Sequence, residues 1–591
     1  MKSPEFIAIA ALMLVAPLSV ASEISAGDTI IVTATRTPVP MADSTVPVTL
    51  ITREDIELSL AADLAELLRF EAGLDIGRNG GPGQATSVFL RGTESNHTLV
   101  LIDGVRVNPG TLGGAAIQNI APEAIERIEI VKGARSALYG TDAIGGVINI
   151  ITRRAASDLF EAGLGAGSFA SQSAHVAIGD RGDDGEFGVN IGWQTTDGYA
   201  PHVNADEPRG FDNLSANLYA ARRFADNEVS LRHWRATGTV EYVDFFLNPI
   251  DQDFENSVTA IALDSKYSHS ANSKLLLSFI RDEIRQNQVP DYVESQRLSL
   301  DWQYSHAFAQ HTLTGGIFLV DENAASLSFG SGFDEDTRVR ALFLQDRFSL
   351  GRHKAFAAIR RTDHENFGQA TTWNAEYAFR LTDALTLNAG LAHAFRAPDA
   401  SDRFGFGGSP DLRPEVADER QLGLRYKPGA RHSIELSLYA NDIEDLVEFD
   451  LQTFTLQNLS KARIQGAQLG YEYRSTDFVL RADLVRQRAD DAASGTRLLR
   501  RAEQSATLSY TQNLGAHRMG FSVLASGERM DFGGVRLAGY VVANFNAQLQ
   551  LPNGWQLNAR VENLLDVSYQ TAANYRMQER SGFLELSYRS R

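Results

Sequence analysis

Ile434-Glu435-Leu436-Ser437-Leu438-Tyr439-Ala440 places an apolar residue at every second position. The same period of two recurs at residues 555–561 and again at residues 584–588. This period puts successive side chains on opposite faces of a β-strand. Such runs alternate with polar turn clusters, for example at residues 181–185, and recur at intervals of about 20 residues. We therefore predict an all-β transmembrane barrel of about 22 antiparallel strands over residues 155–591.

Other classes of protein also contain many strands, and the sequence contains evidence for or against each of them. A β-propeller predicts a repeat of about 40–50 residues, and the chain shows none. A soluble array of β-sandwiches stays an alternative, but the 31 Phe and 17 Tyr suit the aromatic girdles of a membrane barrel. Beyond the N-terminus no stretch contains about 18 consecutive apolar residues, which excludes a helical membrane protein.

The N-terminus has the pattern of a secretory signal. Lys2 precedes an apolar run over residues 6–20, and the small residues of Ser19-Val20-Ala21 follow. A positive start, an apolar centre and a small-residue site are typical of a cleaved signal peptide. An N-terminal membrane anchor is the alternative, although the run is short for a transmembrane helix. We predict that residues 1–21 are a signal peptide.

Composition excludes several classes of function. The 591 residues carry a formal net charge of -19, and none of them is cysteine. An acidic chain lacks the basic face that nucleic acids require. Without cysteine the chain has no disulfides, no thiolate zinc sites and no thiol nucleophile.

Between the signal peptide and the barrel the sequence predicts two further regions. Residues 22–40 form an extended, proline-containing arm and linker, and residues 41–154 mix strand and helix patterns. About 110 residues with a small sheet and two or three helices make a domain. A barrel of about 22 strands has a lumen too wide for its own side chains to fill. We therefore predict that residues 41–154 form a mixed α+β plug inside the lumen.

Local signals give the first elements of this plug. An alternating run at residues 45–51 predicts a strand, and Thr52 with Asp55 three residues later predicts a helix N-terminus with a capping box. A second helical run is expected to end at Gly73. Asp103-Gly104 between two apolar runs predicts a tight hairpin.

Four stretches, in this order along the chain, match one family. They are Asp28 to Ala34; the plug stretches Leu90-Arg91-Gly92, Leu101-Ile102-Asp103-Gly104-Val105 and residues 128–152; Phe395-Arg396-Ala397-Pro398 with residues 410–415; and residues 561–566 with Tyr569. On these residues the mature chain resembles the TonB-dependent receptors of the Gram-negative outer membrane. The resemblance implies a plugged outer-membrane barrel that imports a scarce nutrient and is energised from the inner membrane.

The arm is the predicted contact with the energising partner. Its residues Asp28, Thr29, Ile30, Ile31, Val32, Thr33 and Ala34 look like a TonB box. Ile, Val and Thr favour extended backbone, so we expect a mobile segment that adds as a strand to the periplasmic protein TonB. The alternative is a disordered N-terminal tail.

Within the family, further stretches resemble the branch of cobalamin (vitamin B12) receptors. They are Gly80-Gly81-Pro82-Gly83-Gln84, Phe404-Gly405-Phe406-Gly407-Gly408, Lys461-Ala462-Arg463-Ile464-Gln465-Gly466 and Tyr569-Gln570-Thr571-Ala572. The resemblance implies cobalamin or a related corrinoid as the transported ligand. A ferric siderophore or another metal chelate is the alternative cargo.

The expected ligand contacts are two glycine-rich stretches of the plug and the barrel loops around Tyr242 to Phe246 and Phe404 to Phe406. Glycine allows close approach to a bulky rigid ligand, and aromatic rings suit a large, partly apolar one. The alternative for the glycines is simple loop geometry. The candidate residues are Asn79, Gly80, Gly81, Gly83, Gln84, Thr86, Asn108, Gly110, Phe404 and Phe406.

Polar side chains are expected to hold the plug against the barrel. Arg91 and Lys132 are predicted to face acidic groups of the wall, with Glu419 among them. The alternative for Arg91 is a salt bridge within the plug. Gln468 stands where the family usually has a glutamate that pairs with plug arginines. We expect a wet rim of individually weak ion pairs that would let the plug shift.

Two departures from the family pattern concern metal and assembly. The calcium-binding aspartates of the cobalamin receptor are not recognisable, and only Asp206 is a loose candidate, so calcium stays an open question. The chain ends in Tyr588-Arg589-Ser590-Arg591 and not in the family's terminal aromatic residue, which leaves the effect of Arg591 on assembly open as well.

Motifs for catalysis are absent from the sequence. There is no HExxH, P-loop, dinucleotide fingerprint or nucleophile elbow. We predict a transporter that is not an enzyme, with no permanently bound cofactor, as a monomer among outer-membrane lipids. A passive porin, a barrel enzyme and a signal-transducing receptor are the other classes; the plug and arm disfavour the first, and the short segment before Asp28 disfavours the last.

Overall fold

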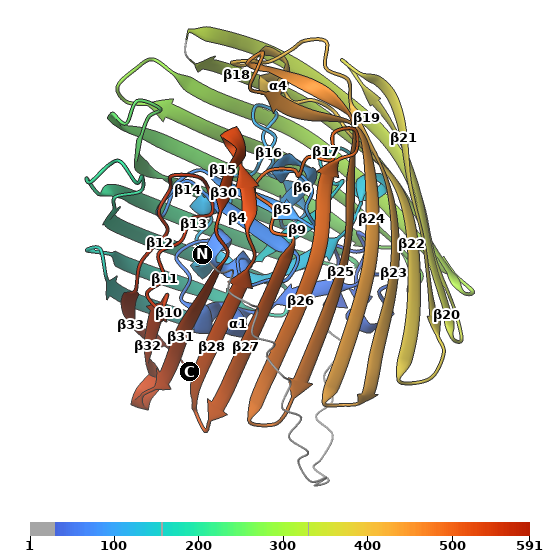
Figure 1. Cartoon of the computed structure of the whole chain (residues 1–591). Helices are drawn as coiled ribbons and strands as arrows, with labels where there is room; N and C mark the ends of the chain where they lie inside the picture. The colour runs from blue at the N-terminus through green and yellow to red at the C-terminus, as the bar shows by residue number, and fades with distance from the viewer. Residues whose placement is uncertain (1–29, 155–157, 329, 591) are drawn as a thin grey trace.

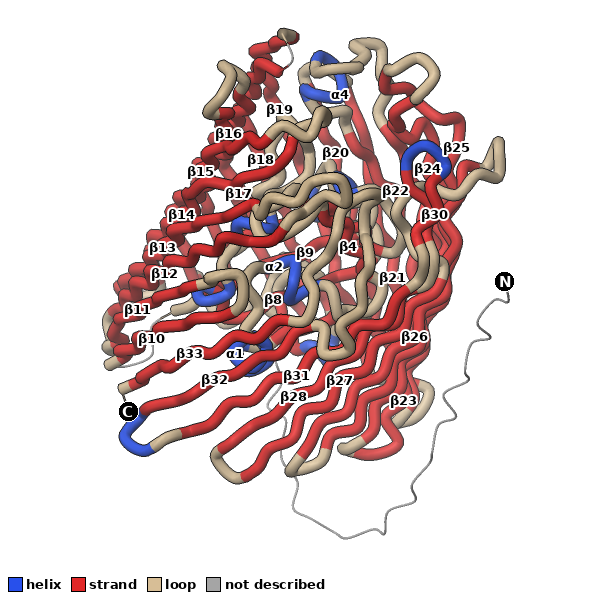
Figure 2. Tube along the Cα trace, turned by 60° about the vertical axis from the view of Figure 1, so that its left-hand side comes forward, coloured by secondary structure: helices blue, strands red, loops and turns tan. Residues whose placement is uncertain are grey.

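The computed structural model describes residues 30–154, 158–328 and 330–590. Its strands close into one large barrel, and the N-terminal part of the chain fills the lumen (Figures 1 and 2). The predicted signal peptide, Asp28 and Thr29 lie outside the described residues. None of the described helices is long and apolar enough to cross a membrane.

The barrel contains 22 antiparallel strands, as the sequence predicts. Neighbours in sequence pair throughout, and β10 closes the ring on β33, with Leu164 opposite Leu586. The strands are β10 (Leu159–Gly167), β11 (Gln172–Arg181), β12 (Gly185–Tyr199), β13 (Arg209–Phe224), β14 (Asn227–Val243), β15 (Pro249–Lys266), β16 (Ala271–Gln286), β17 (Tyr292–Phe308), β18 (His311–Ser328), β19 (Ser331–Leu350), β20 (His353–His364), β21 (Gly368–Arg380), β22 (Leu385–Arg396), β23 (Glu415–Gly429), β24 (His432–Asp450), β25 (Thr455–Arg474), β26 (Phe478–Asp491), β27 (Gln504–Leu514), β28 (His517–Ser526), β31 (Tyr540–Gln550), β32 (Trp555–Glu562) and β33 (Ser581–Arg589). Closure pairs every edge, which is the condition for strands to cross lipid.

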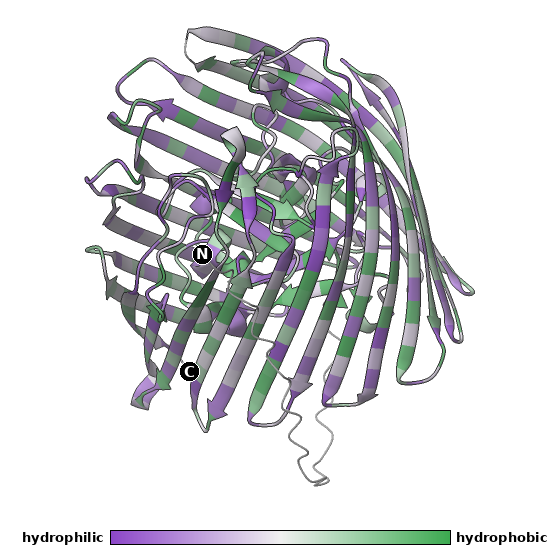
Figure 3. Cartoon of the chain, viewed as in Figure 1, coloured by the Kyte–Doolittle hydropathy of each residue, from purple (hydrophilic) through white to green (hydrophobic). Residues whose placement is uncertain are grey.

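Side chains alternate along the strands between a lipid face and a lumen face. In β24, Leu438 is 44% exposed, whereas its neighbours Ser437 and Tyr439 are buried toward the lumen. In β19, Leu342 and Leu344 are exposed on either side of buried Phe343. Figure 3 shows the resulting bands of apolar and polar residues along each strand. Apolar outside and polar inside is the pattern of an outer-membrane barrel.

The two ends of the barrel differ in the length of their connections. Turns such as 309–310 and 351–352 are tight, whereas the connections at the opposite end include 397–414 and 563–580. Short turns face the periplasm and longer loops face outward in such barrels. The loop 397–414 carries α4 (Ala400–Phe404), which lies against β19 at the upper rim in Figure 1. The loop 527–539 carries the small hairpin of β29 (Arg529–Asp531) and β30 (Val535–Leu537).

The plug is a mixed domain around a five-stranded sheet. Its strand order is β3-β8-β9-β6-β7, and β4 pairs separately with β5. The elements are β3 (Val48–Ile51), α1 (Arg53–Ser59), α2 (Leu64–Leu68), β4 (Leu74–Arg78), β5 (Thr86–Leu90), β6 (Thr98–Ile102), β7 (Val105–Arg106), β8 (Ile125–Lys132), α3 (Ser136–Tyr139) and β9 (Gly146–Thr152).

Local signals in the sequence placed several of these elements correctly. Thr52 caps α1, and its side chain and that of Asp55 form the predicted capping box. Asp103-Gly104 turns the chain between β6 and β7 as predicted. The second helix is shorter than predicted, because α2 ends at Leu68 and the chain reaches Gly73 through a turn.

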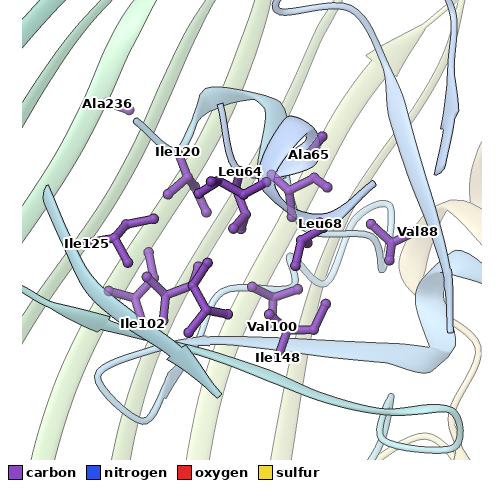
Figure 4. Packing of buried hydrophobic residues seen from close by; sticks show 14 of the residues in the cluster. Leu64, Ala65, Leu68, Val88, Val100, Ile102, Ile120, Ile125, Ile148 and Ala236 are labelled. Carbon is purple, nitrogen blue, oxygen red and sulfur yellow. The ribbon is translucent and has the colours of Figure 1, made fainter. Parts of the chain in front are cut away.

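The apolar core of the plug continues into one side of the barrel wall. Leu64 and Leu68 from α2 pack with Val100 and Ile148 from the sheet, as Figure 4 shows. The same cluster includes barrel residues of β13 to β16, namely Phe211, Trp234, Ala236, Val240, Phe254, Val258, Ala260 and Ile280. The plug is therefore seated by an apolar seam on this side, and its polar contacts lie mainly elsewhere.

Candidate functional site

The described part of the arm is folded back against the plug. β1 (Ile30–Ile31) pairs with β2 (Val39–Pro40), and Ile31 packs in an apolar cluster with Val39 and Val131. Ile31 and Thr33 are fully buried, whereas Ile30 is 45% exposed. The structure thus differs from the prediction of a mobile arm, because the segment after Ile30 is packed against the plug and hydrogen-bonded to it.

Glu129 of β8 supplies those partners. Its Oε2 accepts hydrogen bonds from the backbone nitrogens of Val32 (2.9 Å) and Thr33 (3.0 Å) and from the Thr33 hydroxyl (2.7 Å). The Tyr139 hydroxyl donates to the carbonyl of Thr33 at 3.0 Å, and Asn149 donates to its hydroxyl at the same distance. A fully buried carboxylate with several donors makes strong, charge-assisted bonds.

Arg36 joins the arm to the barrel as well as to the plug. Its guanidinium donates to the carbonyl of Leu138 at 2.7 Å and forms an ion pair with Asp301 of β17. Gln345 of β19 donates to the carbonyl of Thr35 at 2.7 Å. The arm therefore bridges the plug sheet and the barrel wall.

Arg91 contacts the wall at strands β23 and β24. Its Nη1 lies 3.4 Å from Glu419 Oε1 and 3.3 Å from Gln421 Oε1, and its Nη2 donates to Ser437 Oγ at 2.9 Å. The guanidinium stacks on the Tyr439 ring, 4.6 Å from its centre. Arg91 is 3% exposed, so the wet rim predicted from sequence is here a buried contact, and burial lowers the pKa of the guanidinium.

Lys132 does not face Glu419. Its Nζ donates to the carbonyl of Ala72 at 2.5 Å and to Gln468 Oε1 at 3.3 Å. No carboxylate of the described residues lies within ion-pair distance of this ammonium group. Burial lowers the pKa of Lys132 to about 8 and raises the pKa of nearby Glu71 to about 7. The prediction of a contact with Glu419 is wrong for Lys132, whose hydrogen-bond partner on the wall is the amide of Gln468. Two carboxylates of the wall, Asp483 and Glu435, still lie close enough to attract its charge.

The first predicted ligand loop, residues 79–86, is covered by barrel loops. Gly83 lies so close to the ring of Phe211 that a Cβ would collide with it. Gln84 donates to the backbone carbonyl of Glu241 at 2.5 Å. Above this loop, backbone hydrogen bonds tie residues 201–203 to residues 574–576.

The other candidates in this loop maintain its shape. The backbone of Asn79 closes the loop on Ala85 at 3.1 Å, and the Thr86 hydroxyl donates to the carbonyl of Gln84 at 2.8 Å. Gly80 is buried, and Gly81 faces the ring of Tyr199. These contacts match the loop-geometry alternative for residues 79–86.

The second predicted loop borders an open cavity. The Asn108 side chain is fully buried, where it accepts from Val100 N (2.8 Å) and donates to the carbonyls of Thr98 (3.0 Å) and Gly113 (2.8 Å), so it shapes the loop. Gly110 lines the cavity and donates its N–H to Glu322 Oε1 at 2.9 Å.

This cavity lies between the plug and the wall formed by β18, β19 and β20. Its lining includes Arg106, Gly140, Arg297, Phe318, Arg360 and Arg403. The segment with α4 reaches over it, because Ala400 N donates to the carbonyl of Gly110 at 2.9 Å and Ser401 N to that of Thr111 at 3.0 Å.

Phe404 and Phe406 lie beside this cavity and do not line it. The ring of Phe404 is 6.4 Å from that of Phe333, and Phe406 is 61% exposed on the loop. Arg396 anchors the base of the loop through ion pairs with Asp402 (2.7 Å), Asp399 (2.9 Å) and Glu415 (3.1 Å).

Metal ligands are not gathered anywhere in the described part of the chain, where no group of three or more His, Asp or Glu has suitable geometry. Asp206, the calcium candidate, is exposed on the loop between β12 and β13.

Three residues of this site escaped sequence analysis. Arg36 follows the predicted box by two positions, and this closeness to the box was the only indication of its role in the sequence. Glu129 is a charged residue inside an apolar strand, and that exception to the pattern could have identified it. Arg360 lies in an ordinary barrel strand and gave no local signal.

Comparison with known proteins places both parts of the chain in one family. Residues 40–147 match the TonB-dependent receptor plug domain, and residues 159–564 match the TonB-dependent receptor-like β-barrel. The chain is 30% identical to the vitamin B12 transporter BtuB of Vibrio vulnificus, with 99% of each chain covered. Among solved structures it is similar in fold to the siderophore receptor PirA of Acinetobacter baumannii, with a TM-score of 0.80 at 18% identity and 93% and 99% coverage. It is similar also to the ferric enterobactin receptor PfeA of Pseudomonas aeruginosa, with a TM-score of 0.81 at 16% identity and 95% and 100% coverage.

Proposed function

The chain belongs to the TonB-dependent receptor family, and we propose that its cargo is cobalamin (vitamin B12) or a related corrinoid. Members of this family are receptors and transporters of the Gram-negative outer membrane and not enzymes. Membership implies an interaction with TonB and a small-molecule ligand.

The observation that carries the cargo proposal is the likeness to vitamin B12 transporters over the whole chain. The relative from Vibrio vulnificus is matched from end to end at 30% identity, and one from Photobacterium profundum at 28%. The siderophore receptors PirA and PfeA share the fold at 18% and 16% identity. At that level the likeness supports the architecture and not the cargo.

Import in this proposal proceeds by force on the arm. The predicted TonB box begins at Asp28, and its described end is held by Glu129 on plug strand β8, which pairs with the central strand β9. Strand addition by TonB would capture the exposed edge at Ile30 first. Tension would then reach the plug sheet through the Glu129 bonds and the wall through Arg36, and a path would open where polar contacts, not the apolar seam, hold the plug.

The second candidate cargo is a ferric siderophore or another metal chelate. The arginines that line the cavity, among them Arg106, Arg297 and Arg360, favour it, because many such chelates are anionic. Competition between cyanocobalamin and an anionic ferric chelate separates the two cargoes, since the true cargo displaces the other.

Deletion of residues 28–34 tests the energised mechanism. In a cell that depends on this receptor for cobalamin, we expect the deletion to abolish uptake while the cells still bind cyanocobalamin. The matched control removes residues 22–27, which precede the box, and should transport normally. Uptake by the deletion variant at the wild-type rate would contradict energy input through this arm.

A further inference from the structure

Arg360 of β20 is a buried cation that has no carboxylate within ion-pair distance among the described residues. It is 1% exposed, and its Nη1 has no hydrogen-bond partner in the part of the chain that the structure describes. Its Nε donates to the Thr362 hydroxyl at 3.1 Å. Asp301, which is close enough to attract Arg360, is already paired with Arg36.

The side chain is held in place by its neighbours. Its guanidinium stacks on the ring of Phe318, 5.0 Å from the centre. Gly140 at the plug surface gives it room, because a Cβ there would come within 3.2 Å of Arg360 Nη2. Both neighbours line the same cavity. Arg360 is therefore fixed in the lining of that cavity, between the plug and the wall.

The other cations of the cavity differ from Arg360. Arg297 is bound to Glu322 and to the carbonyl of Asn108, each at 2.7 Å, and Arg106 forms an ion pair with Asp142. Arg106 has a buried Nε that no acceptor of residues 30–154, 158–328 or 330–590 contacts. The cavity thus offers unused guanidinium N–H groups, and an unsatisfied buried donor is unfavourable for the fold alone.

We propose that Arg360 is the anchor for an anionic group of the imported ligand. A guanidinium binds phosphate or carboxylate oxygens with two parallel hydrogen bonds. This inference rests on the proposed function and makes it more specific. Cobalamin carries one phosphodiester in its nucleotide loop, whereas cobinamide lacks that group, so the phosphodiester is the part that Arg360 would bind.

The experiment compares cyanocobalamin and dicyanocobinamide as ligands of the detergent-purified full chain. For wild type we expect tighter binding of cyanocobalamin. Arg360→Met should weaken cyanocobalamin binding by on the order of tenfold to a hundredfold and leave dicyanocobinamide unchanged. Arg360→Lys, which keeps the charge without the planar fork, should recover part of the loss.

Arg361→Met is the matched control, because Arg361 is the next residue on the same strand and is exposed on the opposite face. It should bind both ligands as wild type does. Equal losses for both ligands in Arg360→Met would overturn the proposal and leave Arg360 with a purely structural role.

Thermal stability with inorganic phosphate tests the site without any corrinoid. Phosphate should raise the Tm of wild type above its value in chloride of equal ionic strength, and it should not do so for Arg360→Met. If wild type binds no corrinoid but shows this shift, the cargo proposal fails and the anion site stands. If phosphate shifts both proteins equally, the anion site fails whichever cargo is bound.

Discussion

Glu129 concentrates the attachment of the arm in one side chain. A single carboxylate oxygen accepts two backbone N–H groups and one hydroxyl from Val32 and Thr33. Hydrogen bonds to a charged group contribute about 1.5–3 kcal/mol each, more than neutral ones do. The side chain at position 129 should therefore influence the equilibrium between the docked and the released arm.

Glu129→Gln should release the arm more often. The amide keeps the shape of the carboxylate but loses its charge, so we expect a loss of about 2 kcal/mol, on the order of thirtyfold in the ratio of released to docked arm. A spin label on Ile30→Cys reports this ratio, and the chain has no other cysteine. Glu126→Gln on the same strand is the control. An unchanged spectrum in Glu129→Gln would show that the arm is held by other contacts.

Glu71 gives the plug a stability that depends on pH. Burial raises its pKa to about 7 from the usual 4.5. Between these two pH values the folded plug binds more protons than the unfolded chain does. The contribution of Glu71 to the free energy of unfolding is therefore at its maximum below about pH 4.5 and decreases as the pH rises to about 7. Above pH 7 the loss is complete.

Glu71→Gln should remove this dependence. We expect the variant to exceed wild type at pH 8 by at most about 3 kcal/mol in the free energy of unfolding of the plug, and by clearly less at pH 5. Urea unfolding of the plug at the two pH values measures the difference. Glu54→Gln, at a side chain that is 70% exposed, is the control. A gain of equal size at both pH values would contradict the assigned pKa.

At the scale of elements, signals confined to a few neighbouring residues were read correctly from the sequence. Thr52 with Asp55 gave the start of α1, Asp103-Gly104 gave the β6–β7 turn, and the period of two gave the barrel strands. These features depend on local hydrogen bonds and on which face is buried. Glu129 binds an arm 96 residues away in the sequence, and no local pattern encodes such a partner.

The end of α2 shows a related limit. An apolar helical run predicted a helix as far as Gly73, yet α2 ends at Leu68, and turn hydrogen bonds from Glu71 N to the carbonyl of Leu68 and from Leu74 N to that of Glu71 lead the chain into β4. Among the ligand candidates, Gly110 reaches the cavity, whereas residues 79–86 are covered by loops that the sequence could not place.

α4 and its loop form a cover whose position depends on Arg396. This guanidinium is fully buried and forms ion pairs with Asp399, Asp402 and Glu415. Removing one partner of a buried ion cluster leaves the others uncompensated, at about 3–5 kcal/mol. Arg396 therefore holds together the base of the loop that reaches over the cavity.

Arg396→Met should open this loop. We expect faster cleavage by chymotrypsin after Phe404 or Phe406 in the folded, detergent-purified protein, detected by the masses of the fragments. Arg413→Met in the same loop is the control, because its side chain is 66% exposed and exposed ion pairs contribute about 0–1 kcal/mol. Equal cleavage rates for the two variants would show that Arg396 does not secure the loop.

For the whole molecule, the way the plug is seated is asymmetric. The largest apolar cluster joins it to β13 to β16. A smaller one, with Ala134 and Ile144 of the plug, lies against β22 to β26, where ion pairs and hydrogen bonds such as Arg91–Glu419 add to it. The sequence predicted the barrel, the plug and the pairing of Arg91 with the wall. It did not predict the apolar seam, because strand patterns alone do not reveal which lumen-facing positions touch the plug.

The seam constrains how a path can open. An apolar interface loses contact area with any displacement, whereas hydrogen-bonded groups can exchange partners with entering water. In this account the plug stays on β13 to β16, where its largest apolar contact lies, while force from the arm loosens the contacts that include ion pairs such as Arg91–Glu419.

Equilibrium binding of cyanocobalamin to the detergent-purified full chain, with calcium and with a chelator of calcium, tests the central claim most directly. The account predicts tight, saturable binding of one cobalamin per chain, and the two conditions show whether calcium takes part. The absence of saturable binding in both conditions would contradict cobalamin as the cargo and direct the search to anionic metal chelates.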